Sequence, residues 1–483
     1  MHPALKTLQK AIDPDRVLMN SMGALIESNG IRHALNKGVE KWEPGKPLKL
    51  ILAGYVGTRN TGADVRVEEM IRQFRHVIGD DNLELAIMTM DPKLTAGYFR
   101  TVKQVQMPVV FPKFLFDEVP KYHGVIACEG SMFKSKFSSA LTCFMAGALG
   151  MAAAENKVSV GYGAEAGDMT KGLQSFVEKY CRHSLVICRN EPSRGVLGQL
   201  GIRTTSGADT AWTFDPGSLE VGRKLLEDAG WDGKKKVLAV CPINPFWWPV
   251  KPDLMKAAAR TFLGEYKTEH YRSVYFHNKT EENDRKYDAY IEGIAEAMET
   301  FQSERDVFPI LVGMEKLDRR SAEAVKDKLS FDVPLFVSDE HDMYQMVSVL
   351  RSCQMLVSSR FHAIVTSMPG LVPSAGITMD ERIRNLMNDR NDPDLFLEVD
   401  EDDLAEKILR IFHRLYDDGE SIAEGIGRAI PRQLQLMGNM GIDFMDEVVK
   451  TYPEFPRKDL PRTWEAHLPP LPKVVSDILE SYA

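Results

Sequence analysis

The 483-residue sequence is poor in cysteine and has no excess of positive charge. Its six cysteines are scattered without a CxxC spacing, so we expect buried thiols in a reducing compartment and neither zinc ligands nor disulfides. The 60 Lys and Arg against 69 Asp and Glu give a net charge of −9, which argues against a general nucleic-acid-binding face. No HExxH motif and no Cys/His cluster is present, so the sequence requires no metal.

We expect neither a secretory signal nor a membrane span. The first 20 residues lack the apolar core and small-residue cleavage site of a signal peptide, so we expect no export and a cytoplasmic location. The longest uncharged stretch, residues 137–154, would span only about 27 Å as a helix. It is rich in small residues, which favours a buried helix packed against a sheet.

What the sequence does contain is two series of short apolar runs that alternate with helix-length segments. The first series is LKLILAGY, LELAIMTM, HGVIACEG, KVSVGYG and HSLVICRN, and the second is KVLAVCPIN, RSVYFHN, FPILVGM, PLFVSD, CQMLVSSR and VPSAGIT. Nearly continuous apolar runs are typical of parallel strands covered by helices on both faces. The sequence therefore predicts an α/β protein with two open parallel sheets.

The spacing of these runs predicts four segments. We expect a helical and irregular extension over residues 1–46, α/β domains over 47–218 and 219–400, and helices with a Pro-rich tail over 401–483. Two such domains place the carboxyl ends of both sheets across a cleft, where ligands bind in folds of this kind.

Several polar residues follow the predicted strands and would line that cleft. After the first strand, Asn60 can cap a helix, Gly62 permits close approach of a ligand, and Arg59 has no evident role in a simple turn. An ordinary strand-to-helix turn is the alternative. The further candidates are Glu129, Gly130, Ser131, Gly163 and Glu165 in the first domain, and Asn244, His277 and the pair Trp247 and Trp248 in the second. The glutamates can equally serve as caps or salt-bridge partners, and the tryptophans as packing residues.

The segment SSRFHAIVTSMPG combines a helix start, a guanidinium and an imidazole. We expect Ser358 or Ser359 to cap a short helix that carries Arg360 and His362 in its first turn. Such a group suits a phosphate or carboxylate that undergoes proton transfer. The alternative is a capping serine, an arginine paired with an acidic neighbour and a packed histidine.

The order of these motifs resembles the polysaccharide pyruvyl transferase family over about residues 48 to 400. The matching elements are Asn60-Thr61-Gly62, Gly130-Ser131, Gly161-Tyr162-Gly163, ICRNEPSRGVLGQLGI with Arg189, SSRFHA, and VPSAGITMD ending at Asp380. Two positions depart from the family pattern: Gly62-Ala63-Asp64 replaces a frequent G-D-E, and Cys128-Glu129 replaces glycines.

The resemblance implies two Rossmann-like domains in the type B glycosyltransferase (GT-B) arrangement. It also implies transfer of the pyruvyl unit of phosphoenolpyruvate onto two sugar hydroxyls, with release of phosphate, in exopolysaccharide or glycoconjugate biosynthesis. In that reaction Arg360, with Arg189 or Arg59, would bind the donor, and His362 would act as general acid or base. The donor is a substrate, and no cofactor is implied.

Two other functions share this fold: a nucleotide-sugar glycosyltransferase, and a noncatalytic carbohydrate-binding protein. The acceptor can be a free, lipid-linked or nucleotide-linked sugar or glycan, and a lipid-linked one would hold the protein at a membrane surface. We expect no nucleic-acid partner, and the sequence is compatible with either a monomer or a homo-oligomer.

Overall fold

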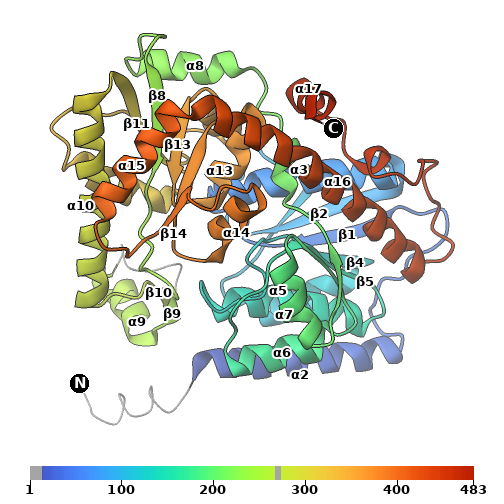
Figure 1. The fold of residues 1–483 in the computed structure, drawn as a ribbon. Helices are drawn as coiled ribbons and strands as arrows, with labels where there is room; N and C mark the ends of the chain where they lie inside the picture. Colours follow the sequence, from blue (N-terminus) through green and yellow to red (C-terminus); the bar gives the residue numbers. More distant parts are fainter. Residues whose placement is uncertain (1–12, 267–273, 483) are drawn as a thin grey trace.

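The computed structural model describes residues 13–266 and 274–482 and contains two α/β domains, each built on a parallel sheet (Figure 1). The first sheet has seven strands in the order β3-β2-β1-β4-β5-β6-β7. They are β1 (Leu48–Ala53), β2 (Leu83–Thr89), β3 (Lys103–Gln106), β4 (Gly124–Ala127), β5 (Val158–Ala164), β6 (Leu185–Cys188) and β7 (Arg203–Ser206). The helices of this part are α2 (Pro14–Ala34), α3 (Thr61–Ile78), α4 (Pro112–Glu118), α5 (Ser139–Ala154), α6 (Lys171–Cys181) and α7 (Glu191–Gln199).

The second sheet has six parallel strands in the order β12-β11-β8-β13-β14-β15. They are β8 (Lys236–Cys241), β11 (Val307–Gly313), β12 (Leu335–Val337), β13 (Met355–Ser358), β14 (Ser374–Thr378) and β15 (Phe396–Glu398). Its helices are α8 (Leu219–Asp228), α10 (Glu281–Glu304), α11 (Arg319–Lys326), α12 (Met343–Arg351), α13 (Phe361–Ser367), α14 (Glu381–Asp389) and α15 (Leu404–Asp417). In each sheet the order reverses beside the first strand of the domain, which places the switch point next to β1 and β8.

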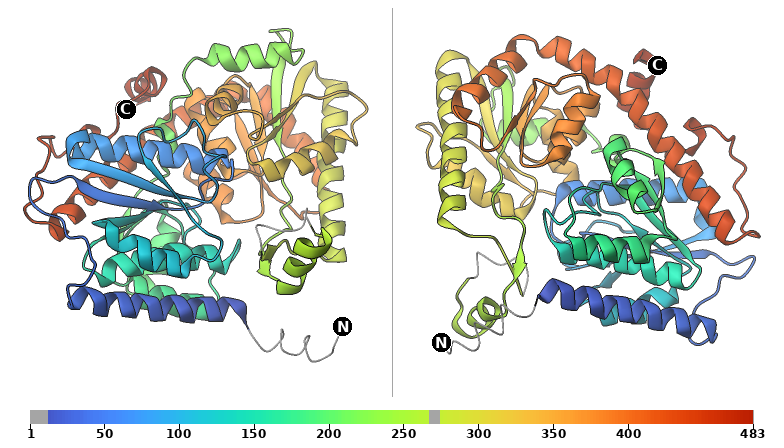
Figure 2. Two further views of the ribbon diagram at one scale, coloured as in Figure 1. Left: turned by 180° about the vertical axis from the view of Figure 1, so that it is seen from behind. Right: turned by 60° about the horizontal axis from the view of Figure 1, so that its bottom comes forward.

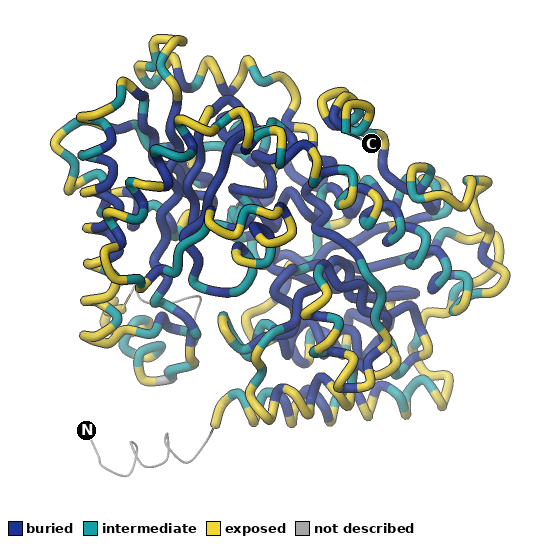
Figure 3. Tube along the Cα trace, in the orientation of Figure 1, coloured by how far each residue is buried: buried dark blue, intermediate teal, exposed yellow. Residues whose placement is uncertain are grey.

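The predicted α/β class with two parallel sheets is confirmed. The central strands are buried along their length, as Figure 3 shows, because helices cover both faces of each sheet. The edge strands β3, β7 and β15 were not predicted, since they are short and largely polar or only half-buried.

One predicted strand is wrong. RSVYFHN does not join the parallel sheet: its described part forms β10 (Tyr275–Phe276), which pairs antiparallel with β9 (Lys251–Pro252) next to α9 (Leu254–Leu263). Residues 272 and 273 of that run lie outside the described residues.

The uncharged stretch forms α5, a buried helix that packs against β4, β5, α2 and α6, as predicted. Small residues allow this close packing: a Cβ at Gly147 would lie 2.8 Å from Met22 of α2. All six cysteines are buried and free, also as predicted. Among the described residues no helix is both long and apolar enough to cross a membrane.

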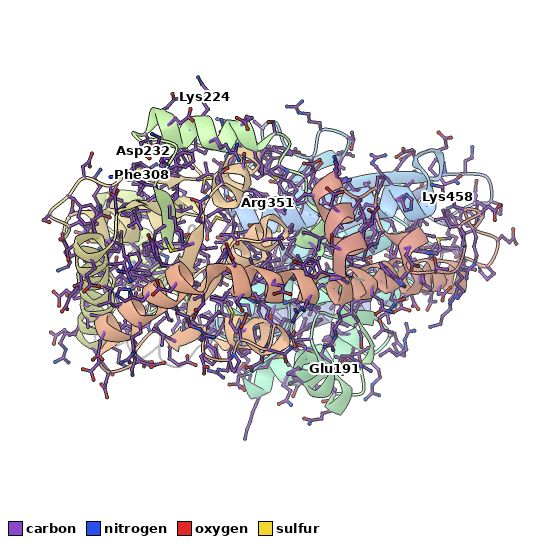
Figure 4. The ribbon with its side chains drawn as sticks, turned by 45° about the horizontal axis from the view of Figure 1, so that its top comes forward. Glu191, Lys224, Asp232, Phe308, Arg351 and Lys458 are labelled. Carbon is purple, nitrogen blue, oxygen red and sulfur yellow. The ribbon has the colours of Figure 1, made fainter. Side chains whose placement is uncertain are left out.

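Helix α16 (Gly419–Thr451) returns from the second domain and lies across the first, as Figures 2 and 4 show. Its Met440 packs on Gly207, and Gln73 of α3 donates to the Met437 carbonyl at 2.8 Å. After α16 an irregular segment leads to α17 (Lys473–Tyr482). Helix α16 therefore contacts elements of both domains.

Candidate active site

A pocket with a cavity volume of about 180 Å³ lies between the two domains. One group of its lining residues can bind a polar ligand: Tyr55, Asn60, Glu129, Ser131, Glu315, Arg360 and Arg382. The other group is apolar or aromatic and includes Met90, Met107, Val109, Phe111, Phe137, Leu141, Phe144, Trp248, Val250 and Tyr275. Both domains supply residues to each group, so the pocket exists only in the assembled pair of domains.

Arg360 lies in this pocket in contact with two carboxyl groups of its own domain. It donates from Nε to Asp318 Oδ2 at 2.8 Å and from Nη2 to Asp318 Oδ1 at 2.5 Å and Glu315 Oε2 at 2.9 Å. From the first domain, Tyr55 donates its hydroxyl to Glu315 Oε1 at 2.9 Å, and Asn60 Nδ2 donates to Glu315 Oε2 at 3.1 Å. We call these five residues the Arg360 cluster.

One guanidinium therefore faces two buried carboxyl groups. Burial raises the pKa of Glu315 to about 7; Arg360 counteracts that rise, and the negative charge of Asp318 adds to it. Burial raises the pKa of Asp318 as well. Burial and the mutual repulsion of the two carboxylates therefore favour the protonated form of one of them.

His362 belongs to a different group of ionisable residues, centred on Asp209. Asp209 Oδ2 lies 3.0 Å from Arg66 Nε, 3.0 Å from Arg189 Nη1 and 3.2 Å from His362 Nε2. Arg189 also donates from Nε to Glu165 Oε2 at 2.8 Å. We call these five residues the Asp209 cluster.

In this cluster three cationic or titratable groups converge on one carboxylate. Burial raises the pKa of Asp209, but Arg66, His362 and Arg189 together outweigh that effect and hold the pKa of the carboxyl well below its usual range. Burial lowers the pKa of His362, and its ion pair with Asp209 only partly offsets this. Burial therefore favours the neutral form of the imidazole.

Two glycines allow the clusters to form. A Cβ at Gly62, in the first turn of α3, would lie 2.4 Å from Cβ, Cγ and Nδ1 of His362, so a side chain there would displace the imidazole. At Gly130 a Cβ would lie 2.6 Å from Arg189 Nη1. Glycine is therefore needed at both positions because another side chain of the protein, His362 or Arg189, lies close against the backbone there.

Arg360 and His362 thus lie near each other but have separate partners. Arg360 contacts carboxyl groups of the second domain and lines the pocket; His362 contacts a carboxylate of the first domain, and its side chain is 12% exposed. The expected serine cap is wrong, because Arg360 occupies the N-cap position of α13. Ser358 Oγ instead accepts from the Arg360 backbone N–H at 2.9 Å, and Ser359 bonds to Tyr290 at 2.8 Å.

The remaining predicted residues of the first domain lie around the pocket or behind it. Asn60 caps α3 as predicted, with Oδ1 accepting from Ala63 N at 3.1 Å. Arg59 turns away and donates to the Tyr98 hydroxyl at 2.5 Å. Asp64 is buried, both of its oxygens have no hydrogen-bond partner among the described residues, and burial raises its pKa well above the ordinary value. Gly163 accepts from Arg66 Nη2 at 2.8 Å.

In the second domain the predicted residues do not all lie at the pocket. Asp380 caps α14, and its Oδ2 lies 2.8 Å from Arg382 Nε. Burial raises the pKa of Asp380, but the positive charges of Arg382 and Lys134 outweigh that effect and lower the pKa to about 2. Arg382 lines the pocket. Asn244 and His277 do not line the pocket. Asn244 Oδ1 accepts from Phe246 N–H at 3.0 Å, and the His277 ring stacks on the Trp247 ring with their centroids 4.2 Å apart. Trp248 is buried and lines the pocket beside Phe137.

Several residues of both clusters were not predicted from the sequence, chiefly Tyr55, Arg66, Asp209, Glu315 and Asp318. Glu315 follows the predicted strand FPILVGM, so the rule that polar residues at strand ends face the cleft would have selected it. Asp209 follows β7, which was not predicted, and Arg66 lies inside a helix. No local signal marks either of them.

Comparison with known protein families matches residues 77–381 to the family described as polysaccharide pyruvyl transferase. No curated protein matches the sequence. Similar solved structures include a UDP-GlcNAc 2-epimerase from Neisseria meningitidis bound to UDP-GlcNAc (12% identity, 83% of this chain and 100% of that chain covered, TM-score 0.50). A second is a co-structure of MnaA with UDP from S. aureus (12% identity, 83% and 98% covered, TM-score 0.50). These likenesses concern the fold, and they confirm the GT-B-like pair of Rossmann-like domains.

Proposed function

Because this chain belongs to the polysaccharide pyruvyl transferase family, and is thus a transferase, we propose that it moves the pyruvyl group of phosphoenolpyruvate onto two hydroxyls of a sugar acceptor. The product is a cyclic ketal, and phosphate is released. The donor is a substrate, and the reaction as proposed uses no cofactor.

The observation that carries this proposal is the presence of Arg360 and Arg382 in one interdomain pocket. Phosphoenolpyruvate has a phosphate and a carboxylate, and a planar guanidinium binds either group with two parallel hydrogen bonds. Asn60 and Ser131 line the same pocket and offer further donors. The role of His362 in moving a proton stays a prediction, since the imidazole is held on Asp209.

The apolar wall supports an acceptor with an apolar part. Aromatic rings such as those of Phe137 and Trp248 can contact the apolar face of a sugar, and the aliphatic residues beyond them suit a hydrocarbon carrier better than a nucleotide. We therefore favour a lipid-linked sugar in polysaccharide biosynthesis, which would bring the protein to a membrane surface peripherally.

Incubation of the purified protein with labelled phosphoenolpyruvate tests the proposal. The acceptors are methyl and octyl glycosides of several hexoses, with UDP-sugars tested separately as donors. We expect phosphate release and a labelled, acid-labile ketal, with octyl glycosides preferred to methyl glycosides by about tenfold or more because their chains bury apolar surface. Consumption of nucleotide sugars alone would reject the pyruvyl assignment in favour of a glycosyltransferase.

A further inference from the structure

Two carboxyl groups line the interdomain pocket, those of Glu129 and Glu315. Glu129 accepts from the adjacent Gly130 N–H at 2.8 Å and lies 3.9 Å from Arg66. Glu315 is more deeply buried, with its side chain 3% exposed, and is in direct contact with Arg360. A donor bound by Arg360 would therefore lie next to Glu315.

The groups that face Glu315 come from several elements. Arg360 precedes α13, Asp318 ends the short helix over Lys316–Asp318, and the neutral Tyr55 and Asn60 come from the β1–α3 turn. Asp64 of α3 adds a further acidic group, because its charge and that of Glu315 repel each other. Arg360 lowers the pKa of Glu315 and Asp318, and Arg59 lowers that of Asp64, each against the larger effect of burial.

A bound donor changes this balance in one direction. Phosphoenolpyruvate on Arg360 would bring negative charge beside Glu315 and would engage the guanidinium that favours its ionised form. Both effects favour a protonated Glu315. A carboxyl group that stays neutral beside an anion can then serve as a proton donor.

We propose that Glu315 is the catalytic acid of this pocket and protonates the methylene carbon, C3, of phosphoenolpyruvate. This inference rests on the proposed function and names a residue that performs its first step.

The proton balance closes within the substrates and this one residue. Glu315 gives its proton to C3, which becomes the methyl group, while the first sugar hydroxyl oxygen bonds to C2. The proton of that hydroxyl leaves with the phosphate when the C2–O–P link breaks at C2. The second hydroxyl then bonds to C2, and its proton returns to Glu315.

The first test measures proton uptake on binding. At pH 8 the phosphate ester is already ionised, because its second pKa is about 6. Calorimetry in buffers of different ionisation enthalpy should show uptake of up to about one proton per phosphoenolpyruvate bound. Glu315→Gln keeps hydrogen-bonding atoms and should bind the donor without this uptake. Glu69→Gln is the matched control, because Glu69 is a buried glutamate outside the pocket whose pKa burial also raises; it should retain the uptake.

The second test measures phosphate release against pH with the best glycoside acceptor. The acid form of Glu315 prevails below its pKa, so wild-type kcat/KM should fall as the pH rises through about 7. Glu315→Gln should lower kcat by about a hundredfold or more and abolish this fall. Asp318→Asn removes a charge that raises the pKa of Glu315, so it should move the fall to lower pH.

The outcomes separate the two proposals. Donor binding with unchanged proton uptake in Glu315→Gln, or no uptake in the wild type, would overturn the role of Glu315 and leave pyruvyl transfer standing. A wild type that does not bind phosphoenolpyruvate would overturn the proposed function and this inference with it. If Glu315→Gln does not fold, the pH shift in Asp318→Asn decides, and an unchanged profile there would contradict the proposal.

Discussion

The two clusters at the domain interface are built from the same kinds of side chain, yet they differ in the ratio of cations to carboxyl groups. In the Arg360 cluster one guanidinium faces Glu315 and Asp318. In the Asp209 cluster two guanidiniums and an imidazole converge on one carboxylate oxygen. Burial is nearly complete in both, so the ratio decides the direction: the pKa of Glu315 rises and that of Asp209 falls.

This difference separates two roles. In the Asp209 cluster the central carboxylate is kept ionised and links the two domains through His362, whereas the Arg360 cluster faces the pocket and favours a protonated carboxyl group.

The largest expected effect is on stability, through Asp209→Asn. The change leaves Arg66 buried without its nearest counter-charge, so the free energy of unfolding should fall by about 3–5 kcal/mol. Asp318→Asn removes one of two carboxyl groups that share a single cation, so it should change the free energy of unfolding by less than about 1 kcal/mol. Urea unfolding at pH 7.5 measures both changes. Equal losses of unfolding free energy in the two variants would show that the ratio of cations to carboxyl groups does not distinguish the clusters.

The next effect is on turnover, through His362→Ala. If the imidazole relays the proton of the first sugar hydroxyl to the departing phosphate, kcat for phosphate release should fall by about a hundredfold or more. His76→Ala, at a half-buried histidine of α3 outside the pocket, should stay within about threefold of the wild type. The alkaline fall assigned to Glu315 should persist in His362→Ala, and its loss there would transfer that titration to the imidazole.

The smallest effect is expected from Gly62→Ala. The added Cβ would lie 2.4 Å from the His362 ring, so overpacking should lower the free energy of unfolding by about 1–3 kcal/mol. Gly198→Ala is the control, because apart from its chain neighbours and the backbone of its own helix no described atom lies within 4 Å of its Cβ position, and alanine favours a helix. A neutral Gly62→Ala would mean that His362 moves aside easily and is not fixed on Asp209.

Much of the fold follows from local patterns. Apolar runs such as LKLILAGY specify buried parallel strands, and Asn60 before an amphipathic segment specifies the start of α3. Short strands such as β7 escaped prediction because their residues are polar, and their pairing comes from the neighbouring strand. The strand predicted from RSVYFHN failed for the opposite reason: apolar residues were present, but their described part pairs outside the main sheet.

The candidate site was predictable only in part. Asn60, Glu129, Ser131 and Arg360 follow strands and do line the pocket. Asn244 follows β8 in the same way, yet its side chain binds its own turn. Position at a strand end brings a residue to the cleft edge, but the local turn decides where the side chain points.

The sequence by itself determined the two parallel sheets and the neighbourhood of Arg360 and His362, because strand burial and helix caps depend on residues close together in the chain. Only the tertiary structure decided their partners: His362 meets Asp209, 153 positions away, and Arg360 meets Glu315, 45 positions away. The physical reason is that a carboxyl group's proton affinity depends on how many cations surround it in space, and that number is fixed only when folding brings residues far apart in the sequence together.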